Sequence, residues 1–98
     1  MTITKKQNGS TLEIAVEGRL NTITAPDLEK ELQDSMSGAD SLILDFAKLD
    51  YISSAGLRVL LSTHKVMVKK GGMTIRNIND VVREVFEATG FIDILNIE

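Results

Sequence analysis

An almost continuous apolar segment in the middle of the chain, residues 41–46 (SLILDF), does most to limit the available folds. Such a run is typical of a strand in a parallel sheet with both of its faces covered. Amphipathic, helix-like segments lie on either side of it, at 24–38 and 54–71. Strands that alternate with helices indicate βαβ units, because parallel strands need crossover connections. We therefore predict an α/β fold with a mostly parallel sheet and helices packed against it.

The first seventeen residues predict an antiparallel hairpin at one edge of that sheet. The pair Asn8-Gly9 separates two segments of strand-like sequence, 2–6 and 11–17. An Asn-Gly pair in this position is a strong hairpin signal. Residues 11–17 alternate apolar and polar side chains, as expected of a strand with one buried face.

Three helices are predicted from their apolar periodicity and their end signals. Their expected limits are an N-cap at Thr24 to Gly38, Ser53 to Gly71, and Asn79 or Asp80 to Gly90. Short strands at 73–78 and 91–97 are expected to follow the second and third helices. The predicted order is β-β-α-β-α-β-α-β, with residues 1–98 forming a single domain of ordinary size.

Composition excludes several classes of function. The net charge of −3 offers no attraction for nucleic acid or for an anionic membrane. The chain has no cysteine, so disulfide and thiolate chemistry are absent. No apolar run approaches the roughly 20 residues of a membrane span, and the first ten residues lack the apolar core of a signal peptide. We expect a cytoplasmic protein with neither a membrane nor a nucleic-acid partner.

The residues of a catalytic site are also missing from the sequence. A hydrolase serine needs a glycine two residues before it and another two residues after it, but Ile52 precedes Ser54 at that spacing. The single histidine, His64, lies ten residues along the same predicted helix, roughly 15 Å away at 1.5 Å per residue. No zinc-ligand set and no phosphate-binding glycine loop is present. We expect no enzymatic activity, no metal and no cofactor.

Two adjacent serines, Ser53 and Ser54, stand at the start of the second predicted helix. In a purely structural role, Ser53 would be the N-cap, worth ~1 kcal/mol. However, small residues continue through Ala55 and Gly56, which leaves this helix start bare for a partner to approach. A helix N-terminus also favours added negative charge, so a phosphoserine would be tolerated there. The residues alone leave a cap and a switch as equal alternatives.

Three segments carry a resemblance to a known family: DYISSAGLRVLL (50–61), GRLNTITAP (18–26) and VREVFEATGF (82–91). Together they resemble the STAS domain of bacterial anti-sigma factor antagonists over nearly the whole chain. The resemblance implies a small sheet with helices that binds an anti-sigma factor, itself a serine kinase. Phosphorylation of one serine at the start of the second helix breaks the complex in that family, and a PP2C-type phosphatase restores it.

The family motif, aligned on Gly56-Leu57, implies that Ser54 is the phosphoacceptor. Ser53 and Asn21 then occupy positions where the family often has aspartate. The loop at 21–24 and the helix start at 53–58 are expected to be neighbours, since both follow strand ends. The implied partner-binding residues are Asn21, Thr22, Ser53, Ser54, Gly56 and Arg58. The family usually adds an amphipathic helix after the last strand, which residues 1–98 do not include.

Three functions are compatible with the sequence. The first is a monomeric anti-sigma factor antagonist switched off by phosphorylation at Ser54. The second is a STAS accessory subunit of a transporter or a stress-signalling complex, without a regulatory phosphoserine. The third, a small enzyme or nucleotide-binding protein, is disfavoured by the missing base, metal ligands and phosphate loop.

Overall fold

The computed structural model describes residues 1–98, in which strands and helices alternate. The bounds of its elements, in chain order, are β1 Thr2–Asn8, β2 Thr11–Leu20, α1 Ala25–Met36, β3 Ser41–Asp45, β4 Leu49–Ile52, α2 Ser54–Met67, β5 Met73–Arg76, α3 Asp80–Thr89, the 3-10 turn η1 Phe91–Asp93, and β6 Asn96–Ile97.

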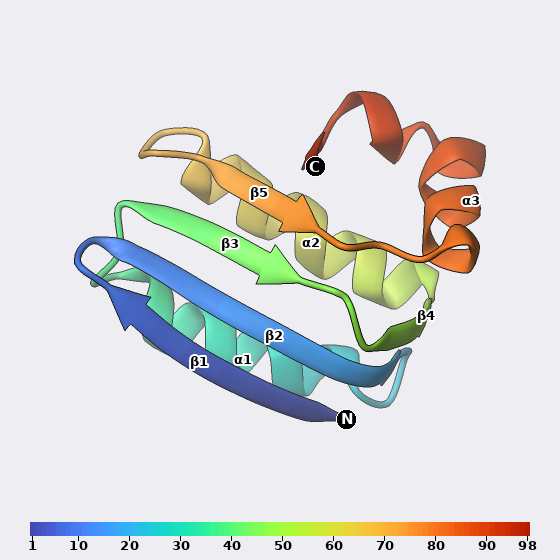
Figure 1. Ribbon diagram of the computed structural model, residues 1–98, viewed down its shortest axis with the longest axis horizontal. Helices are drawn as coiled ribbons and strands as arrows, with labels where there is room; N and C mark the ends of the chain where they lie inside the picture. Colours follow the sequence, from blue (N-terminus) through green and yellow to red (C-terminus); the bar gives the residue numbers. More distant parts are fainter.

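The strands form one six-stranded sheet, in which five follow the order β1-β2-β3-β5-β6 (Figure 1). Strand β1 is antiparallel to β2 and forms the edge, whereas all the other pairings are parallel. Asn8 pairs with Thr11 across a tight turn, with Gly9 at a φ of 61°. The predicted α/β fold and its antiparallel N-terminal hairpin are therefore confirmed.

Strand β4 is absent from the predicted order of elements. It pairs only with the far end of β2, which is longer than expected and runs to Leu20. Strand β2 pairs with β3 as far as Ala15 and with β4 from Gly18 onward, and a register shift between Gly18 and Arg19 separates the two pairings. A bulge bends a strand and increases its twist, which lets one strand change partners.

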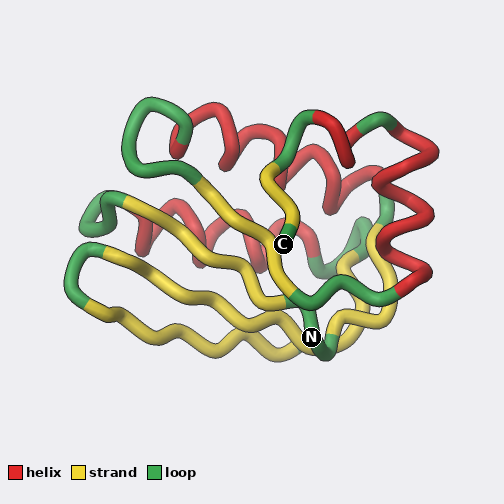
Figure 2. The backbone as a smooth tube through the Cα atoms, turned by 45° about the horizontal axis from the view of Figure 1, so that its top comes forward, coloured by secondary structure: helices red, strands yellow, loops and turns green.

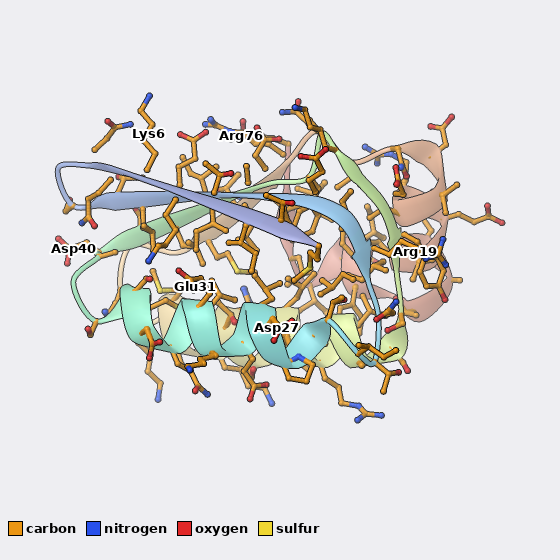
Figure 3. The ribbon with its side chains drawn as sticks, turned by 90° about the horizontal axis from the view of Figure 1, so that it is seen from below. Lys6, Arg19, Asp27, Glu31, Asp40 and Arg76 are labelled. Carbon is orange, nitrogen blue, oxygen red and sulfur yellow. The ribbon has the colours of Figure 1, made fainter.

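The helices α1 and α2 lie side by side on one face of the sheet (Figure 2). The other face is open, and Lys6 and Arg76 extend from it away from the helices (Figure 3). In β3 only Leu42 and Leu44 are fully buried, so the prediction that both faces of this strand are covered was wrong. The strand order explains the difference. Right-handed crossovers that all step in one direction across a sheet place their helices on the same face.

The core is a single cluster of 22 buried apolar residues, to which the sheet and all three helices contribute. Phe46 and Phe86 are its largest fully buried side chains. Met67 and Met73 also belong to it, as is typical of methionine that fills irregular gaps. None of the helices combines the length and apolarity that a membrane crossing requires.

The ends of the later elements agree with the sequence in part. Helix α3 is capped by Asn79, whose Oδ1 accepts a hydrogen bond from the Val82 amide at 2.8 Å, and it ends at Gly90 with a φ of 81°. Helix α2 ends at Met67, earlier than the predicted Gly71. Lys70, which follows it, donates hydrogen bonds to the carbonyls of Met36 and Ala39 near the end of α1. The expected strand at 91–97 was largely wrong, because a 3-10 turn occupies its first half.

Candidate functional site

The ends of β2 and β4 and the beginning of α2 meet at one end of the molecule (Figure 1). The amide of Ser53 donates a hydrogen bond to the carbonyl of Leu20 at 2.8 Å, which ties the start of α2 to the end of β2. The loop at 21–24 follows Leu20 directly. Thr22 of this loop and Arg58 of α2 line the same shallow hollow. The two segments are therefore neighbours, as the sequence predicts.

Gly56 determines how closely the start of α2 approaches the sheet. It is buried in the third position of the helix, and a Cβ built on it would lie 2.7 Å from Cγ of Leu20 and 2.8 Å from Cγ1 of Ile52. Both of those side chains are fully buried. Gly56 thus serves internal packing, and its burial is at odds with the direct partner contact expected of it.

The two serines of the pair have different surroundings. Ser54 is the first residue of α2 and is exposed. Ser53 occupies the N-cap position with extended backbone, but its side chain makes no capping hydrogen bond. Its Oγ is buried and has no partner, so Ser53 holds the N-cap position considered for it but does not make the capping hydrogen bond. Only the Ser54 hydroxyl is presented to other molecules.

The first turn of α2 contains no acidic residue. The free N–H groups and the positive end of the helix dipole are therefore not matched by a carboxylate in that turn. Arg58 lies four residues after Ser54, which places both on one side of the helix. It is exposed and makes no ion pair, since the two salt bridges of the chain, Lys5–Glu31 and Arg76–Glu98, lie elsewhere. This helix start can accept negative charge.

The loop at 21–24 is closed by its own polar side chains. Oδ1 of Asn21 accepts hydrogen bonds from the amides of Ile23 and Thr24, at 2.9 and 3.1 Å. The Thr24 hydroxyl donates to the carbonyl of Arg19 at 2.7 Å and accepts from the Asn21 amide at 2.9 Å. Thr24 is the N-cap residue of α1, as predicted, but its backbone is helical and its side chain makes no capping hydrogen bond. Asn21 holds the loop together, and only Thr22 and Ile23 are exposed in it.

His64 lies near the other end of α2 and is half-buried. Its Nδ1 has no hydrogen-bond partner. Ten residues of helix separate it from Ser54, about 15 Å of helical rise. The Ser54 hydroxyl therefore has no histidine beside it that would act as a base.

Comparison with known proteins identifies the family. The STAS domain family matches residues 2–98, nearly the whole chain. The chain belongs to the STAS domain family. This result confirms the resemblance carried by the motif around Ser54.

Two relatives of this STAS domain have names that describe a function. The protein BtrV of Bordetella bronchiseptica, named as an anti-sigma factor antagonist, is 38% identical over 96 residues, which are 96% of this chain and 83% of that protein. The anti-sigma-B factor antagonist of Bacillus subtilis is 28% identical over 93 residues, which are 94% of this chain and 85% of that protein.

A solved structure shares the fold of this STAS domain. The anti-sigma factor antagonist SpoIIAA in its unphosphorylated form superimposes with a TM-score of 0.83 at 17% identity, covering 99% of this chain and 88% of that one. The phosphorylated form of SpoIIAA, a Bacillus cell fate determinant, gives a TM-score of 0.75 at 16% identity, covering 99% and 91% of the two chains.

One exposed residue of the STAS surface was not singled out by the sequence analysis. Ile23 lies between two threonines at the tip of the 21–24 loop and is 83% exposed. A signal for its position was present, because an Asn followed three residues later by a Thr, just before a helix, is typical of a side-chain-closed turn. In this turn the apolar side chain of Ile23 stays outside the core.

Proposed function

We propose that this STAS domain is an anti-sigma factor antagonist whose binding to an anti-sigma factor is controlled by phosphorylation of Ser54. The observation that carries the proposal is the position of Ser54, an exposed hydroxyl at the first position of α2. The names of BtrV and of the Bacillus subtilis relative support the same function.

Phosphorylation at this position would leave the fold intact. The phosphate adds about 1.5 to 2 negative charges. The amides at the helix start and the helix dipole favour such a charge, typically by about 0.3–1 kcal/mol. Arg58, one turn along the helix, is available as a counter-charge. The free protein therefore gains a compatible charge rather than a destabilising one.

The same charge would oppose the complex. A partner that packs against the small residues Ser54 and Ala55 would exclude water from the phosphate. A buried charge without a matched counter-charge costs several kcal/mol, and about 1.4 kcal/mol is already a tenfold loss of affinity. One modification would thereby separate the two proteins without unfolding either of them.

The proposal also specifies the protein's setting. The partner is an anti-sigma factor that is a serine kinase, and a PP2C-type phosphatase reverses the modification. This STAS domain acts in the cytoplasm as a single-domain monomer and catalyses no reaction itself. Thr22, Ser54 and Arg58 form the exposed contact surface, while Asn21, Ser53 and Gly56 shape it from beneath.

Two aspartate variants test the switch. We expect Ser54→Asp to melt at or slightly above the temperature of the parent and to bind the anti-sigma factor at least tenfold more weakly. The matched control is Ser10→Asp, which adds the same charge at an exposed serine in the β1–β2 turn, at the far end of the sheet. It should bind like the parent. Full-strength binding by Ser54→Asp would contradict the electrostatic switch.

The acceptor itself is tested by incubation with the cognate kinase and ATP, followed by peptide mass spectrometry. We expect phosphate on Ser54 and none on Ser54→Ala, which should still bind the kinase. Phosphate mainly on Ser53, Thr22 or Thr24 would show that the assignment is wrong. A complete lack of phosphorylation would favour an accessory STAS subunit without a regulatory phosphoserine.

A further inference from the structure

We propose that Ile23 is the apolar anchor through which this STAS domain binds its anti-sigma factor, in an apolar pocket of that protein. This inference rests on the proposed function. At 83% exposure, Ile23 is the most exposed large apolar side chain of the chain. It belongs neither to the core cluster nor to the partly buried residues packed against it. The isoleucine side chain therefore makes no contribution to core packing at this position.

Hydrogen bonds within the 21–24 loop hold the backbone at Ile23. The Ile23 amide donates a hydrogen bond to Oδ1 of Asn21 at 2.9 Å. The hydroxyl of the next residue, Thr24, accepts a hydrogen bond from the Asn21 amide and donates one to the Arg19 carbonyl. Thr24 leads directly into α1. Ordering a loop on binding costs free energy, so a loop that is ordered beforehand binds more tightly. Ile23 is presented on a loop that is closed before any partner arrives.

The position of Ile23 relative to Ser54 matches the layout of a protein interface. Its neighbour Thr22 lines the hollow shared with Arg58, and the residue before the loop, Leu20, is hydrogen-bonded to Ser53. Polar and charged groups thus lie beside a single apolar side chain. Interfaces concentrate binding energy in a few buried anchors surrounded by a polar rim that excludes water.

This layout defines the chemistry of the partner surface. It requires an apolar pocket large enough for an isoleucine side chain, with hydrogen-bond acceptors or carboxylates at its edge opposite the unpaired Arg58 guanidinium. A phosphate on Ser54 would bring strongly hydrated charge to the rim of that pocket. The anchor and the switch would therefore act on the same contact, which explains why one modification could abolish binding.

The test measures binding isotherms and thermal melts with the purified cognate anti-sigma factor kinase. We expect Ile23→Ser to have the same melting temperature as the parent and to bind at least tenfold more weakly. Loss of a buried isoleucine side chain from the complex should lower the affinity by more than a factor of ten. Ile23→Leu keeps the apolar volume and should bind within about threefold of the parent. The matched control is Val68→Ser, at a 61% exposed apolar residue after α2, at the other end of that helix. It should bind like the parent.

Binding by Ile23→Ser within twofold of the parent would overturn the inference. So would an equal loss with Val68→Ser, or a clearly lower melting temperature for Ile23→Ser. The Ser54→Asp variant separates this failure from that of the proposed function. If Ser54→Asp loses binding while Ile23→Ser retains it, the anchor is wrong and the switch stands. If the parent itself does not bind the kinase, both are wrong.

Discussion

Replacement of Gly56 by alanine tests the close packing that positions Ser54. The added Cβ would lie 2.7 and 2.9 Å from Cγ and Cδ2 of Leu20, and 2.8 Å from Cγ1 of Ile52. Leu20 is 0% exposed and Ile52 is 1% exposed, so both side chains are enclosed by other core residues and cannot simply turn out into solvent. Relief must come from a shift of α2 away from the ends of β2 and β4.

The expected cost follows from two opposing effects. Overpacking in a well-packed core typically costs about 1–3 kcal/mol. Alanine is favoured over glycine within a helix by up to about 1 kcal/mol, and by less in the first turn. We expect Gly56→Ala to lower the free energy of unfolding by about 1–2 kcal/mol. For a domain of this size, that corresponds to a fall of about 5–15 °C in melting temperature.

Thermal and urea unfolding of Gly56→Ala should be compared with those of Gly38→Ala. Gly38 lies just after α1, has no positive φ, and would place its Cβ more than 4 Å from any neighbour. Gly38→Ala should therefore be neutral or stabilising by up to about 1 kcal/mol.

A second variant identifies the colliding atoms. In a Leu20→Ala background, two of the three short contacts of the new methyl group are gone and only the one with Ile52 is left, so Gly56→Ala should cost less than it does in the parent. If Gly56→Ala melts at or above the temperature of the parent, the reasoning that the first turn of α2 is held by contact with Leu20 and Ile52 is refuted.

Two further predictions concern helix capping. Asn79→Ala removes the hydrogen bond from the Val82 amide and the one to the Leu49 carbonyl, so it should lower the free energy of urea unfolding by about 1–2 kcal/mol; an unchanged midpoint would contradict the capping role. Ser53→Ala should leave that free energy unchanged or raise it by about 1 kcal/mol, because the buried hydroxyl makes no hydrogen bond that would be lost and its removal from water is uncompensated. A loss of about 1 kcal/mol, typical of a capping serine, would contradict that result.

Two features that the sequence predicted correctly, the first turn and the limits of α3, depend on contacts between residues close together in the chain. The Asn8-Gly9 turn needs only a positive φ at one glycine. The limits of α3 need a side-chain bond from Asn79 across three residues and a left-handed glycine at its end. The prediction of a final strand at 91–97 was largely wrong because these residues are mostly apolar but contain no local signal that distinguishes a turn from a strand.

Other features depended on neighbours that are distant in sequence. Strand β4 is four residues long and exists because β2 bulges after Gly18 and extends to a second partner. The open face of the sheet follows from the order of its strands, which no single segment encodes. A continuous apolar run such as 41–46 indicates a buried strand, but only the crossovers on either side decide how many of its faces are covered.

The same division applies to the candidate site. By itself the sequence determined the family, through the motif around Ser54, and the placement of that serine at a helix start. The tertiary structure decided what each residue of the motif presents. Ser54 faces solvent, the hydroxyl of Ser53 is enclosed, Asn21 is engaged within its own loop, and Ile23 extends outward. The physical reason is that exposure depends on how the start of α2 packs against the end of β2, and that contact joins segments more than thirty residues apart, such as Leu20 and Ser53.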